Sequence, residues 1–327
     1  MVNRKVSFNE IINASVRLQD KVIRTPLLQS AYLNKKLKTN IFLKAENLQT
    51  IGAFKYRGAL NAILQLPSNI KKVVAWSSGN HAQAVAAAAK ITGREATIVM
   101  PMDSPKAKLE GTAFWGASIV KYDRLNEDRE KIGKEIAEKI NAAIIPPFDH
   151  VDVINGQATA GLECIEQLAI KNINPDIVLC CCGGGGLIAG ISTAIKAKFN
   201  DSKIYSVEPD NFDDTKKSLE NNQIIMNSMH HKSICDALLA EKPGSLTFEI
   251  NRLNLTAGLS VTDEEALMAM HFAFRHFKII LEPGGAVALA AAMTDKVDIK
   301  DKNVLVIASG GNVDKEIFEK CLRVDII

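Results

Sequence analysis

Short apolar stretches rich in β-branched residues alternate with helix-length segments along almost the whole chain. Seven of them have the length and composition of strands: residues 41–45, 73–76, 96–100, 118–122, 177–181, 204–207 and 303–308. Such alternation produces parallel sheets covered by helices, with ligands bound at the carboxyl ends of the strands. The sequence therefore predicts the α/β class.

Two helix starts and one domain boundary can be predicted from local signals. Ser7 precedes Glu10, and Thr262 precedes Glu265, by the three residues of a capping box. A chain of 327 residues favours two domains. The turn at residues 146–149, which contains two prolines, is the best candidate for a boundary between them.

Composition excludes several classes of protein. A net charge of +3 and an aromatic content of 6% argue against a nucleic-acid surface. The apolar runs are far shorter than the roughly 20 residues that a membrane helix needs, so we expect no membrane span. The N-terminus does not have the pattern of a signal peptide, so we expect a cytoplasmic protein.

The six cysteines should then be free thiols. Cys180, Cys181 and Cys182 are consecutive at the end of the predicted strand 177–181, where adjacent residues point to opposite faces, and they do not have the CxxC spacing of a zinc site. Buried thiols are therefore the favoured interpretation of this run.

Four consecutive glycines, Gly183, Gly184, Gly185 and Gly186, join the predicted strand 177–181 to an apolar helix that starts near Leu187. Their backbone N–H groups can surround a phosphate at the helix N-terminus. A tight turn without a ligand is the alternative, and the GxGxxG spacing of a dinucleotide site is absent.

Three other segments carry candidate reactive side chains. Lys55 stands near a predicted helix start beside Phe54, where it could be a Schiff-base lysine or a solvated surface residue. Polar groups that could bind a carboxylate follow strand 73–76, although a helix-capping cluster would look similar; they are Ser77, Ser78, Gly79, Asn80 and His81. Ser309 follows strand 303–308.

These segments, in this order, resemble the fold-type II pyridoxal-phosphate enzymes of the serine racemase and threonine dehydratase group. The resemblance extends from about Thr25 to Val313, and includes the segments 44–49, 156–159 and 282–286. It implies the two-domain fold of tryptophan synthase β type. The smaller domain would be residues 53–148, inserted in a larger one made of 1–52 and 149–327.

The same resemblance implies roles for individual residues. Lys55 would hold pyridoxal phosphate covalently, Phe54 and Ala237 would sandwich its ring, and Asn80 would bond the ring hydroxyl. Gly183 to Leu187 would bind the phosphate, Glu282 would complete the cofactor site, and Ser309 would face the pyridine nitrogen. The loop formed by Ser77, Ser78, Gly79, Asn80 and His81 would receive the substrate carboxylate.

A cation loop is also implied. Four acids lie between Glu208 and Asp214, and carboxylates this close together must be solvated or share a hard cation. The segment resembles the racemase cation site, in which Glu208, the Phe212 carbonyl and Asp214 would bind Mg²⁺ or Ca²⁺. A solvated loop is the alternative.

The predicted function is β-elimination of water from a 3-hydroxy amino acid such as L-threonine or L-serine, which yields a 2-oxo acid and ammonia. A neutral Ser309 makes the ring a weaker electron sink than an Asp would, which favours elimination over a long-lived carbanion. Lys55 would be the general base. We expect a homo-oligomer, either dimer or tetramer.

Three alternatives remain. Ser78 matches the serine racemases, where it would act on the face opposite Lys55, although it could instead cap a helix. A 3-hydroxyaspartate dehydratase would need a cation for the second carboxylate, for which Lys108 and Arg129 are candidates. A non-catalytic metabolite-binding protein is the alternative of another class.

Overall fold

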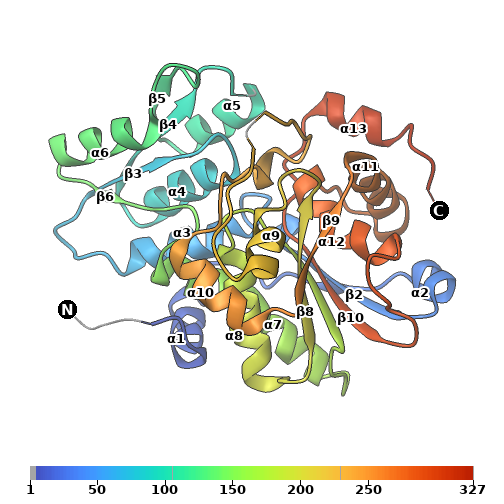
Figure 1. The fold of residues 1–327 in the computed structure, drawn as a ribbon. Helices are drawn as coiled ribbons and strands as arrows, with labels where there is room; N and C mark the ends of the chain where they lie inside the picture. The colour runs from blue at the N-terminus through green and yellow to red at the C-terminus, as the bar shows by residue number, and fades with distance from the viewer. Residues whose placement is uncertain (1–4, 105, 229, 327) are drawn as a thin grey trace.

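The computed structural model describes residues 5–104, 106–228 and 230–326, and is drawn in Figure 1. The strands are β1 Leu27–Leu28, β2 Asn40–Ala45, β3 Lys72–Trp76, β4 Glu95–Pro101, β5 Ser118–Tyr122, β6 Ala143–Ile144, β7 Ile177–Cys181, β8 Lys203–Pro209, β9 Ala257–Val261 and β10 Asn303–Ala308. The α-helices are α1 Phe8–Leu18, α2 Ala31–Leu37, α3 Lys55–Leu64, α4 Asn80–Ile91, α5 Lys106–Phe114, α6 Arg129–Lys139, α7 Val151–Ala169, α8 Gly186–Lys198, α9 Asp214–Asn221, α10 Ser245–Asn254, α11 Asp263–Phe272, α12 Pro283–Met293 and α13 Lys315–Cys321. Three shorter helices are η1 Glu46–Leu48, η2 Asp236–Leu238 and the π-helical η3 Ala273–Phe277.

Within these residues the strands form a six-stranded sheet, in the order β1-β2-β10-β7-β8-β9, and a four-stranded sheet, in the order β5-β4-β3-β6. All seven predicted strands are present, and the α/β class is confirmed. Strands β1, β6 and β9 were not predicted, because β1 and β6 contain two residues each and β9 is only partly buried. The expectation of wholly parallel sheets is wrong at one edge, where β1 pairs with β2 antiparallel.

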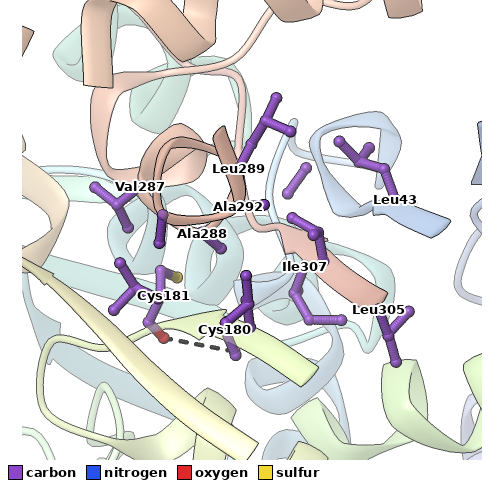
Figure 2. Close-up of a cluster of buried hydrophobic side chains, with 14 of the residues drawn as sticks. Leu43, Cys180, Cys181, Val287, Ala288, Leu289, Ala292, Leu305 and Ile307 are labelled. Carbon is purple, nitrogen blue, oxygen red and sulfur yellow. Dashed lines mark hydrogen bonds between the residues drawn. The ribbon is translucent and has the colours of Figure 1, made fainter. Parts of the chain in front are cut away.

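The core of the larger sheet depends on small residues. Helix α12 has the sequence PGGAVALAAAM and is buried throughout, with Pro283 in its first turn, where no backbone N–H is needed. Figure 2 shows its side chains Val287, Ala288 and Leu289 against residues of β7 and β10. In Figure 1 helices α7 and α8 cover the other side of this sheet.

Glycines allow α7 to pack closely against two other helices. A Cβ atom on Gly156 of α7 would lie 2.6 Å from the Arg57 carbonyl oxygen of α3. A Cβ atom on Gly190 of α8 would lie 2.8 Å from the Ile154 carbonyl oxygen of α7. Real Cβ atoms do not approach so closely, so α3 and α8 are both held against α7 by backbone contact.

The smaller sheet lies wholly inside the segment 53–148, and α4 and α6 pack on it. The division of the chain at residues 53 and 148 remains our proposal for the domain boundary. No helix in the described ranges has both the length and the apolar character required to cross a membrane.

The two predicted helix starts differ in detail. The capping box of Thr262 and Glu265 is complete. At α1 the Ser7 hydroxyl accepts from the Glu10 N–H at 3.3 Å, but the Glu10 carboxylate accepts from Asn13 at 3.1 Å instead of from Ser7. Only half of that capping box therefore forms.

Candidate active site

One cleft brings together the four segments that the sequence marks as reactive, at the carboxyl ends of β3, β7 and β10. The predicted cofactor and carboxylate residues all line it: Phe54, Lys55, Ser77, Ser78, Gly79, Asn80, His81, Gly183, Gly184, Gly185, Gly186, Leu187, Ala237, Glu282 and Ser309. Trp76, Pro147, Cys181 and Asp236 also line it and were not predicted as site residues. Each of the four stands beside a residue or segment that the sequence singles out, but only the fold shows that it lines the cleft.

Lys55 is the first residue of α3, and its ammonium faces the cleft. Its Nζ donates to the Pro147 carbonyl oxygen at 2.6 Å and lies 5.2 Å from the centre of the Phe54 ring. Burial lowers the pKa of Lys55 to about 8, against a smaller opposing effect of Cys181. Lys55 is therefore not a solvated surface lysine, and its neutral amine is accessible near neutral pH.

A buried ion network fixes the helix that carries Lys55. The Arg57 guanidinium, which has no exposed surface, donates to Glu46 at 2.8 and 2.9 Å and to Glu163 at 2.7 and 2.9 Å. Lys44 donates to the same Glu163 at 2.6 Å. Although burial raises the pKa of Glu46, the charge and hydrogen bonds of Arg57 outweigh it and hold that pKa below its usual value.

The glycine loop has the form of an anion cradle. A Cβ atom on Gly184 would lie 2.4 Å from the Phe148 ring, and Gly185 has a φ of +90°, a conformation that favours glycine. Helix α8 begins at Gly186 without a capping side chain. Its first N–H groups therefore remain available to an anion, while the Thr247 hydroxyl holds the Gly184 carbonyl at 2.7 Å.

The loop after β3 is held by side chains from distant segments. Asn80 Nδ2 donates to Glu282 at 2.5 Å, and Asn80 Oδ1 accepts from Asn312 at 2.8 Å. Helix α4 starts at Asn80 with Gly79 as its N-cap and with no side-chain capping bond. The alternative in which Ser78 caps this helix is therefore wrong. Its side chain lines the cleft, where its hydroxyl can contact a bound molecule.

His81 contributes to this loop as a neutral imidazole. Its Nε2 lies 2.8 Å from the Ile145 carbonyl oxygen and must be the donor, because a carbonyl only accepts. Burial, reinforced by the charge of Lys55, lowers the pKa of His81 to about 3. Because its Nε2–H is bound to the Ile145 carbonyl and the ring carries no positive charge, His81 cannot neutralise a carboxylate, and the backbone N–H groups of the loop are left to meet one.

Glu282 lies on the far wall, buried, with its Oε2 atom unpartnered. Burial, together with the charge of Asp236, raises its pKa to about 7. A buried oxygen without a donor is costly, which indicates that a bound group completes this wall. Cys181 lines the same wall, and hydrogen bonding from Cys180 lowers the pKa of its thiol.

The predicted cation loop lies outside the cleft, at the end of β8. Glu208, Phe212 and Asp214 are all buried, so the solvated-loop alternative is wrong. Glu208 accepts from the Thr215 and Lys216 N–H groups at 2.9 and 2.8 Å, and Asp214 Oδ2 is buried without a partner. Burial and the neighbouring Asp214 raise the pKa of Glu208, and burial raises that of Asp214 to about 7.

No group of three or more His, Cys, Asp or Glu side chains arranged to hold a metal occurs in the part of the chain that the structure describes. The predicted set has two carboxylates and one backbone carbonyl. All six cysteines are described, buried and free, as expected.

Comparison with known proteins gives a consistent result. The family model of the "pyridoxal-phosphate dependent enzyme" matches residues 18–310. The chain is 40% identical to an L-threo-3-hydroxyaspartate ammonia-lyase of Saccharomyces cerevisiae over 95% of each chain. It is also 40% identical to a serine racemase of Schizosaccharomyces pombe, over 95% of this chain and 96% of the other. The solved structure of a T.th. threonine deaminase superposes with a TM-score of 0.90 at 38% identity, over 94% of this chain and 99% of that one.

The depressed pKa of Lys55 predicts how the cofactor-free protein reacts with pyridoxal phosphate. Only the neutral amine attacks an aldehyde, so the rate of covalent capture should rise with pH and reach half its maximum close to 8. Borohydride trapping followed by peptide mass spectrometry measures this rate at Lys55, with exposed Lys131 as the internal comparison. A midpoint near 10.5, the ordinary value for lysine, would contradict the assignment.

Proposed function

The chain belongs to the pyridoxal-phosphate-dependent enzymes, and we propose that this lyase eliminates water from a 3-hydroxy amino acid such as L-serine or L-threonine. Elimination breaks the Cα–H and Cβ–O bonds and releases water. Hydrolysis of the resulting enamine consumes one water, breaks the Cα–N bond and forms the carbonyl, so the net products are a 2-oxo acid and ammonia. The observation that carries the proposal is the partly desolvated Lys55 amine, which shares one cleft with an anion cradle and a carboxylate loop.

The residues present fit the cofactor. A Cβ atom at Gly184 would collide with the Phe148 ring, so only glycine fits at this point of the cleft, and Glu282 Oε2 is a buried acceptor without a donor. We propose that Gly183 to Leu187 hold the phosphate, that Phe54 and Ala237 enclose the ring, and that Asn80 and Ser309 contact its polar atoms. Pyridoxal phosphate supplies the electron sink that acidifies the substrate Cα–H.

The protein's own groups then direct the reaction. Lys55 Nζ takes the Cα proton, which its low pKa permits near neutral pH. Backbone groups of Ser77 to His81 orient the substrate carboxylate. The hydroxyl of Ser309 is neutral and would not stabilise a protonated ring nitrogen, which would favour departure of the β-hydroxyl over storage of charge in the ring.

Release of ammonia and 2-oxo acid from L-serine and L-threonine tests the proposal directly. Lys55→Ala should lower kcat by roughly 10²- to 10⁴-fold or more, because it removes both the covalent anchor and the base. Lys131→Ala, on the exposed face of α6, is the matched control and should retain activity. Elimination by Lys55→Ala within tenfold of wild type would refute the role. A protein that takes up no pyridoxal phosphate would instead support a metabolite-binding protein.

Racemisation is a second candidate activity, because Ser78 lines the cleft and is not used as a helix cap. A hydroxyl on the face opposite Lys55 could exchange a proton with Cα from that side. Ser78→Ala should lower racemisation and turnover of D-substrates by roughly 10²- to 10⁴-fold, while L-serine elimination persists. Equal loss of all these activities, measured by chiral chromatography and oxo-acid release, would contradict the opposite-face role.

We also propose that Glu208, the Phe212 carbonyl and Asp214 bind Mg²⁺ or Ca²⁺, since the donors are oxygens and one buried oxygen has no partner. Chelation should lower the melting temperature by a few degrees, and Mg²⁺ should restore it, because a cation bound only by the native state stabilises it. Asp214→Asn should abolish the response, whereas Asp210→Asn in the same loop should keep it. Indifference to chelator, with no metal by elemental analysis, would contradict the site.

A further inference from the structure

A buried ammonium that lines the cleft, that of Lys108, is not used by the proposed reaction. Lys108 of α5 has a side chain only 6% exposed, and it forms an ion pair with Asp236 of η2. Burying an ammonium is unfavourable unless a carboxylate compensates it. The exposure of the two partners differs, because the Asp236 side chain is 43% exposed. The carboxylate is therefore the solvent-exposed partner of the pair, and the ammonium is the buried one.

The position of this ammonium relates it to the substrate. A Cβ atom on Gly79 would lie 3.7 Å from Lys108 Nζ. Gly79 belongs to the loop that we propose receives the substrate's α-carboxylate. A second carboxylate on Cβ of the same substrate lies only one carbon further away, within reach of the same ammonium.

The remaining charges of the cleft favour such a substrate. Apart from Lys55, the cations that line it are Lys108 and Arg129, and the exposed Arg129 forms no ion pair with any described residue. The acidic residues that line it are Asp236 and Glu282. If an incoming carboxylate replaces Asp236 beside Lys108, the buried ammonium keeps a carboxylate partner.

We propose that Lys108 determines specificity by binding the second carboxylate of a 3-hydroxy dicarboxylic amino acid, and that Asp236 occupies its place in the empty site. Arg129 adds a second positive charge at the entrance. This inference rests on the proposed function, because it concerns which 3-hydroxy amino acid is eliminated.

The test compares kcat/KM for L-threo-3-hydroxyaspartate with that for L-serine in the holoenzyme. Wild type should prefer the dicarboxylic substrate. Lys108→Met, which keeps the length of the side chain without its charge, should lower kcat/KM for hydroxyaspartate roughly 10- to 100-fold and that for serine less than about threefold. Asp236→Asn removes the competing charge and should lower KM for hydroxyaspartate alone. Lys131→Met on α6 is the control and should change neither substrate.

A binding measurement separates recognition from catalysis. Calorimetric titration of the holoenzyme should show that succinate binds more tightly than propionate, which differs from it by one carboxylate. Lys108→Met should remove that difference, and Asp236→Asn should enlarge it. Unchanged cofactor absorbance in both variants establishes that the site is intact.

Two outcomes would overturn the inference. An equal loss for serine and hydroxyaspartate in Lys108→Met would assign Lys108 to the α-carboxylate or to the fold. A wild type that eliminates from serine and has no preference for hydroxyaspartate would remove the second-carboxylate role while leaving the proposed function intact. Absence of elimination from every 3-hydroxy amino acid would be a failure of the proposed function itself.

Discussion

The fully buried Arg57 guanidinium, between the carboxylates of Glu46 and Glu163, is the interaction on which the geometry of the cleft depends. It joins η1, α3 and α7, and Lys44 extends the network to β2. Loss of one partner from such a buried network costs about 3–5 kcal/mol, because the remaining charge stays in the interior. Bidentate hydrogen bonds also have a fixed direction. They therefore set the rotation of α3, whose first residue, Lys55, lies only two positions before Arg57.

Close helix packing gives a second constraint on the same cleft. Gly156 and Gly190 allow α7 to contact both α3 and α8 at backbone distance. The lysine at the start of α3 and the glycine loop at the start of α8 are therefore both positioned by α7. Helix packing sets the distance between them before any ligand binds. Less conformational entropy is then lost when one group binds to both.

Much of this arrangement could be predicted from the sequence because its signals are local. Seven strands and the glycine turn each depend on a few adjacent residues, whereas the role expected of Lys55 comes from the resemblance and not from its own segment. The ion pair of Lys108 with Asp236 could not be predicted, because 128 positions separate the partners and neither lies in a motif. The burial of Glu208 and Asp214 depends in the same way on how α9 folds over β8, which no local charge pattern describes. The antiparallel β1 is too short to leave a periodic pattern.

The three consecutive cysteines Cys180, Cys181 and Cys182 differ in how readily their thiols ionise. Burial raises the thiol pKa of Cys164, Cys180, Cys182, Cys235 and Cys321, which keeps these thiols protonated and slow to react. Cys181, whose pKa is lowered, faces the cleft that receives the cofactor. Among the described cysteines, Cys181 is therefore the thiol whose ionisation the fold favours. A cofactor bound as we propose would lie against it, so the site that holds the cofactor also contains this thiol.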